Sequence, residues 1–339
     1  MPLRLDAPVE SVVTDLERYI PARMHEAHVP GLSIALVREA KIVWARGFGE
    51  KSVYRHEPVT PETVFEAASL GKPITAYAAL KLRDAGLLQL DAPMDSYLSQ
   101  PYLGDSSYAR EVTIRRVLSH TSGLSNNLFW KNTTIHFQPG TKFSYSGVGF
   151  AYLQIVIESV TGKSFEDFMQ ENVLEPLGMA SSSYSPPQGI RARMADGYFP
   201  VLGLQLPLPA LHHYSRPNAA STLVSTPSDL ARFMIELMEP RQMSAKATAE
   251  MLTQQVTVSD CVAWGLGIGL QHGPAGRAFW HWGSNPGYKS FMLGYPDHKA
   301  GVVIMTNGSD GLDIVDDIAQ RALGGPACGY WRDVTFISR

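Results

Sequence analysis

The sequence has few of the residues that would indicate a disulfide scaffold or a metal centre. Its 339 residues include two cysteines, Cys261 and Cys328, which allow one bridge at most. Neither cysteine lies in a Cys-x-x-Cys pattern or in a Cys/His cluster with metal-ligand spacing. We therefore expect two ordinary thiols and no bound metal or cofactor.

The chain also has no strong charge imbalance and no long apolar run. Its 29 Lys and Arg residues stand against 32 Asp and Glu residues, and no basic stripe is interleaved with aromatics, so nucleic acid is not an expected partner. No window reaches the apolar length of a membrane span, and residues 1–6 lack the apolar core of a secretory signal. These observations predict a cytoplasmic protein without a membrane partner, although a mature exported form would look the same.

Two widespread hydrolase motifs are missing as well. The absence of a G-x-S-x-G nucleophile elbow disfavours an ordinary α/β-hydrolase. The absence of H-E-x-x-H disfavours a metalloenzyme of that type. A hydrolytic function would therefore need a different nucleophile and base.

Apolar periodicity predicts the main elements. The composition, 45% hydrophobic and 18% charged, is that of a globular chain of one or two domains. Helical spacing predicts helices over 8–28, 70–85, 114–119, 147–161, 164–172, 227–238 and 311–323. Strand patterns occur at 31–37, 41–49, 264–270, 288–295 and 301–307.

Strands at both ends of the chain and helices in its middle predict an α/β fold. We expect a mostly antiparallel sheet built from both chain ends and flanked by the terminal helices, with an inserted all-α region. The expected division is a sheet domain of residues 1–64 plus 262–339 and a helical domain of residues 65–261. The cleft between such layers is a natural ligand site.

A serine and a lysine stand at the start of a predicted helix. Ser69 and Lys72 are three residues apart, which places both side chains on one helix face about 5 to 6 Å apart at Cβ. Pro73 is tolerated only near a helix start, so the helix should begin at about Ser69 or Leu70. The positive end of the helix and burial in a cleft both favour a neutral amine, which could take the proton of Ser69.

Two further segments strengthen this pair. Tyr145 lies in a turn that leads into an apolar helix, where a phenol could relay protons. His281 begins a glycine-rich turn placed just before a strand. The backbone N–H groups of Ser69 and Ser284 could together form an oxyanion hole for a tetrahedral intermediate.

In their order and context these segments resemble the superfamily of serine β-lactamases and penicillin-binding proteins, especially the class C-like branch with its esterases and D-amino-acid peptidases. The resemblance covers nearly the whole chain. It rests on Ser-x-x-Lys at Ser69–Lys72, the tyrosine of the family's Tyr-x-Asn motif at Tyr145, Lys/His-x-Gly at His281–Gly283, and the phrases LSHTSGL (118–124), LEPLGM (174–179) and LVSTPSDLARFM (223–234).

The resemblance implies a β-lactamase/transpeptidase-like fold and a role for each matching residue. It makes Ser69 the acylated nucleophile, and Lys72 with Tyr145 the groups that exchange its proton and activate the deacylating water. It implies that His281 tunes Tyr145 and meets the leaving group or a substrate carboxylate. The remaining implied roles are an oxyanion hole at Ser69 and Ser284, substrate contacts at Gly147, Trp282 and Gly283, and a structural role for His120.

Two departures from the family pattern bear on the substrate. Gly147 stands where the family usually has asparagine, so a side-chain amide that contacts acyl-amide substrates is missing. His281 replaces the lysine of class C β-lactamases and weakens a permanent positive charge. We therefore expect a carboxylesterase-like serine hydrolase without a cofactor, with weak β-lactamase activity beside it.

The alternatives are a D-amino-acid amidase, a D,D-peptidase or a β-lactamase, an acyltransferase, and a penicillin-binding sensor that does not turn over. In each case the partner is a small ester or amide. The sequence does not indicate an oligomeric state.

Overall fold

The computed structural model describes residues 4–5, 7–104, 106–126, 133–201, 204–207, 216–273, 276–325, 332 and 334. Its centre is a nine-stranded antiparallel sheet with the strand order β3-β2-β1-β13-β12-β11-β10-β9-β8. These strands are β1 (Gly31–Arg38), β2 (Lys41–Ser52), β3 (Glu57–Pro58), β8 (Val256–Thr257), β9 (Val262–Trp264), β10 (Gly269–Gly273), β11 (Gly276–Asn285), β12 (Tyr288–Tyr295) and β13 (Ala300–Thr306). The predicted mostly antiparallel sheet from both chain ends is confirmed.

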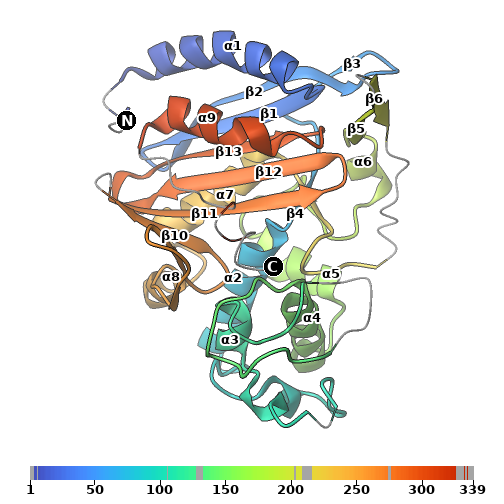
Figure 1. Cartoon of the computed structure of the whole chain (residues 1–339), viewed down its shortest axis with the longest axis vertical. Helices are drawn as coiled ribbons and strands as arrows, with labels where there is room; N and C mark the ends of the chain where they lie inside the picture. The colour runs from blue at the N-terminus through green and yellow to red at the C-terminus, as the bar shows by residue number, and fades with distance from the viewer. Residues whose placement is uncertain are drawn as a thin grey trace.

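Helices cover both faces of this sheet. The terminal helices α1 (Val9–Glu26) and α9 (Leu312–Leu323) pack side by side on one face, and α7 (Pro227–Met238) packs on the other (Figure 1). The strands alternate accordingly. Leu32, Ile34 and Leu36 of β1 join the core under α1 and α9, whereas Ala35 and Val37 join the core shared with α7.

The middle of the chain forms a helical region below the sheet in Figure 1. Its helices are α2 (Gly71–Asp84), α3 (Ile114–Leu118), α4 (Gly147–Thr161), α5 (Phe165–Met169), the π-helix η3 (Gln170–Leu174) and α8 (Ala245–Met251), with the 3-10 helices η1 (Met94–Tyr97) and η2 (Ala109–Glu111). The short helix α6 (Gln188–Arg191) lies beside the sheet near β5, and the 3-10 helix η4 (Pro296–His298) connects β12 to β13. Two small sheets join β4 (Phe65–Ala68) to β7 (Leu223–Ser225) and β5 (Tyr198–Val201) to β6 (Leu204–Pro207). The division into domains at residues 65 and 261 stays a prediction; α7 and β8, which lie between these positions, contact or join the large sheet.

One strand prediction is wrong. Instead of a single strand over 264–270, β9 ends at Trp264 and β10 begins at Gly269, with a bend between them. Gly267 adopts a positive φ of 79° in this bend, and its N–H donates to the Leu118 carbonyl at 2.8 Å. A Cβ at Gly267 would lie 2.4 Å from that of Ala76 in α2, so close contact with the helix requires glycine and breaks the strand.

The prediction of two ordinary thiols is wrong for Cys261, which is disulfide-bonded. This residue immediately precedes β9. Cys328 lies outside the described residues.

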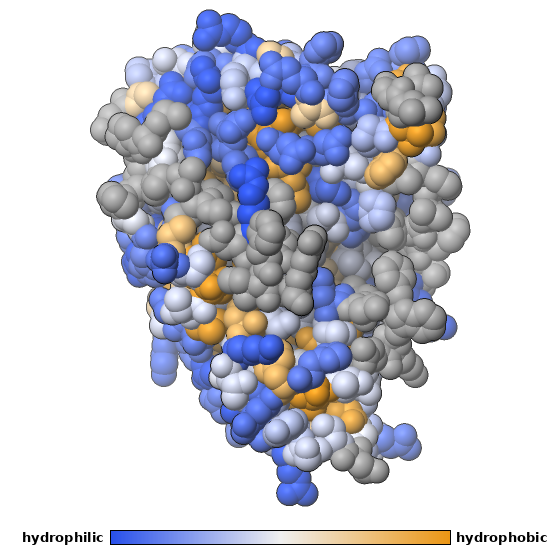
Figure 2. All heavy atoms as spheres, in the orientation of Figure 1, coloured by the Kyte–Doolittle hydropathy of each residue, from blue (hydrophilic) through white to orange (hydrophobic). Residues whose placement is uncertain are grey.

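The surface seen in Figure 2 is largely polar, with scattered apolar areas. One of them covers the β5–β6 hairpin at the upper right, where Phe199 and Leu206 face each other across the two strands. Their side chains are 48% and 40% exposed. The hairpin therefore carries an exposed apolar pair at the edge of the molecule.

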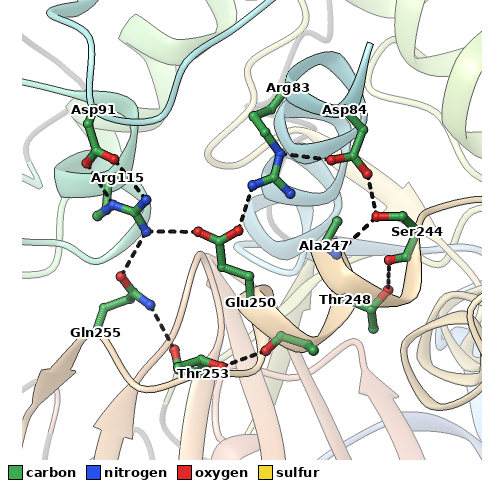
Figure 3. Close-up of polar contacts among 11 residues, drawn as sticks. Arg83, Asp84, Asp91, Arg115, Ser244, Ala247, Thr248, Glu250, Thr253 and Gln255 are labelled. Carbon is green, nitrogen blue, oxygen red and sulfur yellow. Dashed lines mark hydrogen bonds and ion pairs between the residues drawn. The ribbon is translucent and has the colours of Figure 1, made fainter. Parts of the chain in front are cut away.

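A polar network fastens α2 to its neighbours. Glu250 of α8 lies between two guanidinium groups, accepting from Arg83 of α2 at 2.6 Å and from Arg115 of α3 at 3.1 Å (Figure 3). Arg115 also makes a bidentate contact with Asp91 at 2.7 and 2.9 Å. The carboxylate of Glu250 therefore joins three helices around the end of α2.

Removing Glu250 should destabilise this junction. We expect Glu250→Ala to lower the free energy of unfolding by roughly 1–2 kcal/mol, because two partly buried arginines lose a shared acceptor. The exposed pair of Glu171 and Lys163 offers a matched control, since Glu171→Ala removes a carboxylate from an isolated surface contact and should cost under about 0.5 kcal/mol. Urea denaturation measures both; equal losses would contradict a special role for the network.

Candidate active site

Ser69 lies at a sharp transition between a strand and a helix. It follows β4 directly and stands two residues before the first residue of α2. Ala68 adopts φ = 51°, a left-handed conformation that is uncommon for residues other than glycine. Pro73 is the third helical residue, as the predicted helix start requires. This turn carries the chain from the sheet side to the helical side and leaves Ser69 between them.

Lys72 is buried and contacts Ser69, as the spacing predicts. Its Nζ lies 2.9 Å from Ser69 Oγ and donates a hydrogen bond to the Ala220 carbonyl at 2.8 Å. Ser69 Oγ also donates to that carbonyl, at 3.4 Å. The lysine is 2% exposed, and burial lowers its pKa from 10.5 to about 7. Near neutral pH a large fraction of Lys72 is thus an amine that can accept a proton.

Tyr145 packs against both members of this pair. Lys72 Nζ is 4.9 Å from the centre of the Tyr145 ring. Burial raises the pKa of Tyr145 well above its usual value, while a hydrogen bond with Ser69 acts in the opposite direction. The phenol therefore stays protonated at neutral pH and can donate or relay a proton.

His120 fixes the segment that contains Tyr145. Its ring centre lies 4.3 Å from that of Tyr145, and its Nδ1 accepts the backbone N–H of Ser146 at 3.0 Å. Ser146 in turn caps α4 by accepting the Gly149 N–H at 2.9 Å. These contacts agree with the structural role expected of His120. They also hold Gly147, whose backbone begins the helix, beside the site.

His281 occupies a strand rather than a turn before a strand. It lies inside β11 opposite Met292 of β12, and the turn comes later, at residues 286–287. The prediction was wrong because two glycines and a proline near His281 resemble a turn, whereas pairing with β12 continues the strand to Asn285. The imidazole is 0% exposed, and its ring centre lies 6.1 Å from that of Tyr145.

The charge of His281 follows from this burial. Desolvation, with a further contribution from Lys72, lowers the pKa of His281 from 6.5 to about 3. Its Nδ1 lies 2.7 Å from the Trp282 carbonyl. A neutral, buried imidazole at this position faces the Tyr145 side of the site and supplies no positive charge to a ligand.

Gly283 brings β11 against β4, the strand that ends one residue before Ser69. A Cβ on this residue would lie 2.2 Å from the Ala67 carbonyl oxygen and 2.2 Å from Ser290 Oγ. Ser290 Oγ itself donates to the Ala67 carbonyl at 2.8 Å. Ala67 is two residues before Ser69, and Ser284 follows Gly283, so the two segments predicted to supply the oxyanion hole run close together here. The ring centre of Trp282 lies 5.0 Å from that of Tyr145, with the two rings tilted by 40°, and Trp282 is almost fully buried.

Sequence reasoning missed the Ala220 carbonyl. This oxygen accepts hydrogen bonds from both Lys72 and Ser69, and it comes from a loop about 150 residues further along the chain. Every residue has a backbone carbonyl, so the identity of residue 220 does not reveal that its oxygen enters the site. The only signal available was that a buried amine beside Ser69 would require an acceptor.

The pKa of Lys72 predicts the pH dependence of catalysis by the free enzyme. We expect kcat/KM for a neutral ester to fall tenfold per pH unit below about pH 7, because the ammonium form of Lys72 cannot accept the proton of Ser69. His281, with a pKa of about 3, should not contribute to this limb. Initial rates between pH 5 and pH 9 measure the profile, and constant kcat/KM down to pH 5 would contradict the assignment.

Within the residues that the structure describes, no group of three or more His, Cys, Asp or Glu side chains is arranged to hold a metal ion. In the same part of the chain, no helix combines the length and apolar character needed to span a bilayer.

Comparisons with known proteins agree with this architecture. Penicillin-binding protein 4 of Amycolatopsis lactamdurans is 28% identical to this chain, with 88% of the chain and 86% of the relative covered. Penicillin-binding protein 4* of Bacillus subtilis (strain 168) is 26% identical, with coverages of 88% and 72%. The structure of an octameric penicillin-binding protein homologue from Pyrococcus abyssi superposes with a TM-score of 0.79 at 27% identity, covering 88% of this chain and 74% of the other.

A class C β-lactamase structure has a TM-score of 0.78 at 24% identity, covers 93% and 95% of the two chains, and shows the shared fold. The sequence model of the β-lactamase family matches residues 16–325. The chain therefore belongs to the β-lactamase family, within the superfamily of serine β-lactamases and penicillin-binding proteins.

Proposed function

We propose that this serine hydrolase cleaves carboxylic esters through an acyl-enzyme on Ser69. The observation that carries the proposal is the 2.9 Å contact between Ser69 Oγ and the buried amine of Lys72, whose pKa burial lowers to about 7. A serine hydroxyl becomes an effective nucleophile when such a base takes its proton.

The proposed reaction has two halves. Ser69 Oγ attacks the ester carbonyl while its proton passes to Lys72 Nζ, and the N–H groups of Ser69 and Ser284 bind the oxyanion. The C–O bond to the leaving alcohol then breaks, and the alcohol receives a proton from Lys72, directly or through the Tyr145 phenol. In the second half a water molecule gives a proton to the same groups and attacks the acyl carbonyl. The bond between the acyl carbon and Ser69 Oγ then breaks, the proton passes to Ser69 Oγ, and the acid is released.

Two features of the site favour esters over β-lactams and peptides. The neutral, fully buried His281 stands where class C β-lactamases have a lysine, so this position offers no cation to a substrate carboxylate. Gly147 lacks the side-chain amide that the family usually presents to an acyl-amide. An uncharged ester does not depend on either group.

Turnover of a short p-nitrophenyl ester, nitrocefin and a peptide ending in D-Ala-D-Ala, each with wild type and Ser69→Ala, tests the proposal. We expect the ester to have the highest kcat/KM and Ser69→Ala to lose it by at least about 10³-fold. Full esterase activity in Ser69→Ala would overturn the mechanism.

The same experiment separates the alternatives. Faster release of D-alanine than of p-nitrophenol would favour a D,D-peptidase, a reading supported by the penicillin-binding names of the relatives. A stable adduct on Ser69 without turnover would favour a sensor. Formation of a methyl ester when methanol is added would indicate acyl transfer.

A further inference from the structure

The last residue of β11, Asn285, makes two hydrogen bonds across the site. Its Nδ2 donates to Glu66 Oε2 at 2.6 Å and to the Ser221 carbonyl at 3.1 Å. Its own carbonyl accepts from Lys289 Nζ at 2.9 Å, which holds the residue at the end of the strand. One amide group therefore contacts two segments that lie 219 and 64 residues away in the sequence.

Each of these segments carries part of the candidate site. Glu66 belongs to β4, three residues before Ser69, and is only 4% exposed. Ser221 follows Ala220, whose carbonyl accepts from both Lys72 and Ser69. Asn285 itself follows Ser284, the predicted second oxyanion donor. The side chain thus links the nucleophile strand, the acceptor of the lysine and the oxyanion strand.

The chemistry of the link is specific to an amide. A primary amide nitrogen carries two N–H groups, and here the two acceptors use both of them. An aspartate at this position would have the same shape but no donor when ionised. It would also place a second carboxylate beside buried Glu66, and like charges in such a position repel.

We propose that Asn285 is a positioning residue that holds Ser284 beside Ser69 and the Ala220 carbonyl beside Lys72. The inference rests on the proposed role of Ser69 as nucleophile. In this proposal Asn285 takes no part in the reaction itself and sets the geometry of the groups that do. Small displacements of such groups are costly because catalysis depends on their alignment.

The test measures how fast a fluorophosphonate labels Ser69, alongside steady-state ester kinetics, with rates expressed per labelled site. We expect Asn285→Asp to slow labelling and to reduce kcat by about 100-fold, with KM changed less than about threefold. The acid limb of the labelling rate should also move from about pH 7, because the acceptor of Lys72 is displaced. A residue needed only for folding would reduce the number of labelled sites and leave these rates and the pH profile unchanged.

Reversing the polarity of the pair provides a second measurement. In Glu66→Gln combined with Asn285→Asp, the amide at position 66 donates to the carboxylate at position 285. We expect this double variant to label about tenfold faster than Asn285→Asp alone, without full recovery because the bond to the Ser221 carbonyl stays lost. Glu66→Gln alone keeps an acceptor for Asn285 and should label within about threefold of wild type. The double variant remains informative where Asn285→Asp alone does not fold.

Asn172→Asp is the matched control. Asn172 Nδ2 also donates to a backbone carbonyl, that of Phe168 at 3.0 Å, within the helical region. We expect wild-type labelling from this variant. Wild-type labelling of Asn285→Asp, or a double variant no faster than the single one, would overturn the proposal. If Ser69→Ala were labelled as fast as wild type, the proposed nucleophile would be wrong; labelling of Ser69 without ester turnover would leave the positioning test intact.

Discussion

Replacement of Lys72 by methionine should reduce kcat/KM for an ester by about 10³ to 10⁴-fold and, at the same time, stabilise the folded protein. The loss of activity follows from removal of the base that contacts Ser69 Oγ. The gain in stability follows from burial, because folding removes the Lys72 side chain from the water that stabilises its protonated form. Lys72 would thus be a residue that lowers the stability of the fold and is retained for activity, as is common in active sites.

The sign of the stability effect depends on pH. The pKa of Lys72 is about 7 in the folded protein and 10.5 as the ordinary value, so between these pH values the unfolded chain binds more protons. The free energy of unfolding of the wild type therefore rises with pH through this window. Below about pH 7 it is lowered by the full cost of burying the Lys72 ammonium. This difference in the pKa of Lys72 corresponds to at most about 5 kcal/mol. The variant Lys72→Met gains less than that, because it also loses the hydrogen bonds of the amine. We expect Lys72→Met to gain roughly 1–3 kcal/mol at pH 6 and clearly less at pH 9.

Urea unfolding at these two pH values measures the effect, and Lys81→Met is the matched control. Lys81 lies on the same helix, and its Nζ donates to the Asn172 carbonyl at 2.8 Å, away from Ser69. This control should retain ester hydrolysis. A loss of stability in Lys72→Met at pH 6, or the same gain at both pH values, would contradict the origin assigned to the lowered pKa.

Gly283→Ala should reduce kcat/KM by about 100-fold or more and lower the free energy of unfolding by roughly 2–3 kcal/mol. The new methyl group would lie 2.2 Å from the Ala67 carbonyl oxygen, which is backbone and cannot turn away. β11 would have to move from β4, and Ser284 would move with it. The expected kinetic signature is a fall in kcat, since the oxyanion contact strengthens in the transition state.

Gly189→Ala controls for the change from glycine to alanine. A Cβ on Gly189 meets nothing within 4 Å, so its stability should stay within about 0.5 kcal/mol of wild type. Ester kinetics and thermal unfolding of both variants give the comparison. Wild-type kcat in Gly283→Ala would show that the close approach of β11 to β4 has no part in catalysis.

Local sequence patterns predicted what depends on neighbouring residues. The three-residue spacing of Ser69 and Lys72 placed their side chains together, and periodicity located α4 and α7 at their observed bounds. The bend at Gly267 and the extension of β11 through His281 depend on contacts with α2 and β12, which no local pattern contains. The same limit applies to the Ala220 carbonyl, whose role is set by the path of a distant loop.

The left-handed turn at Ala68 also determines when the site can exist. It places Ser69 where β4, α2, the Ala220 loop and β11 converge, so the reactive pair needs segments that are spread from residue 65 to residue 285. Before these segments meet, Lys72 is an ordinary solvated ammonium and Ser69 an ordinary alcohol. A nascent or partly folded chain is consequently inert toward acylating compounds, and covalent labelling of Ser69 counts only those molecules that have completed folding.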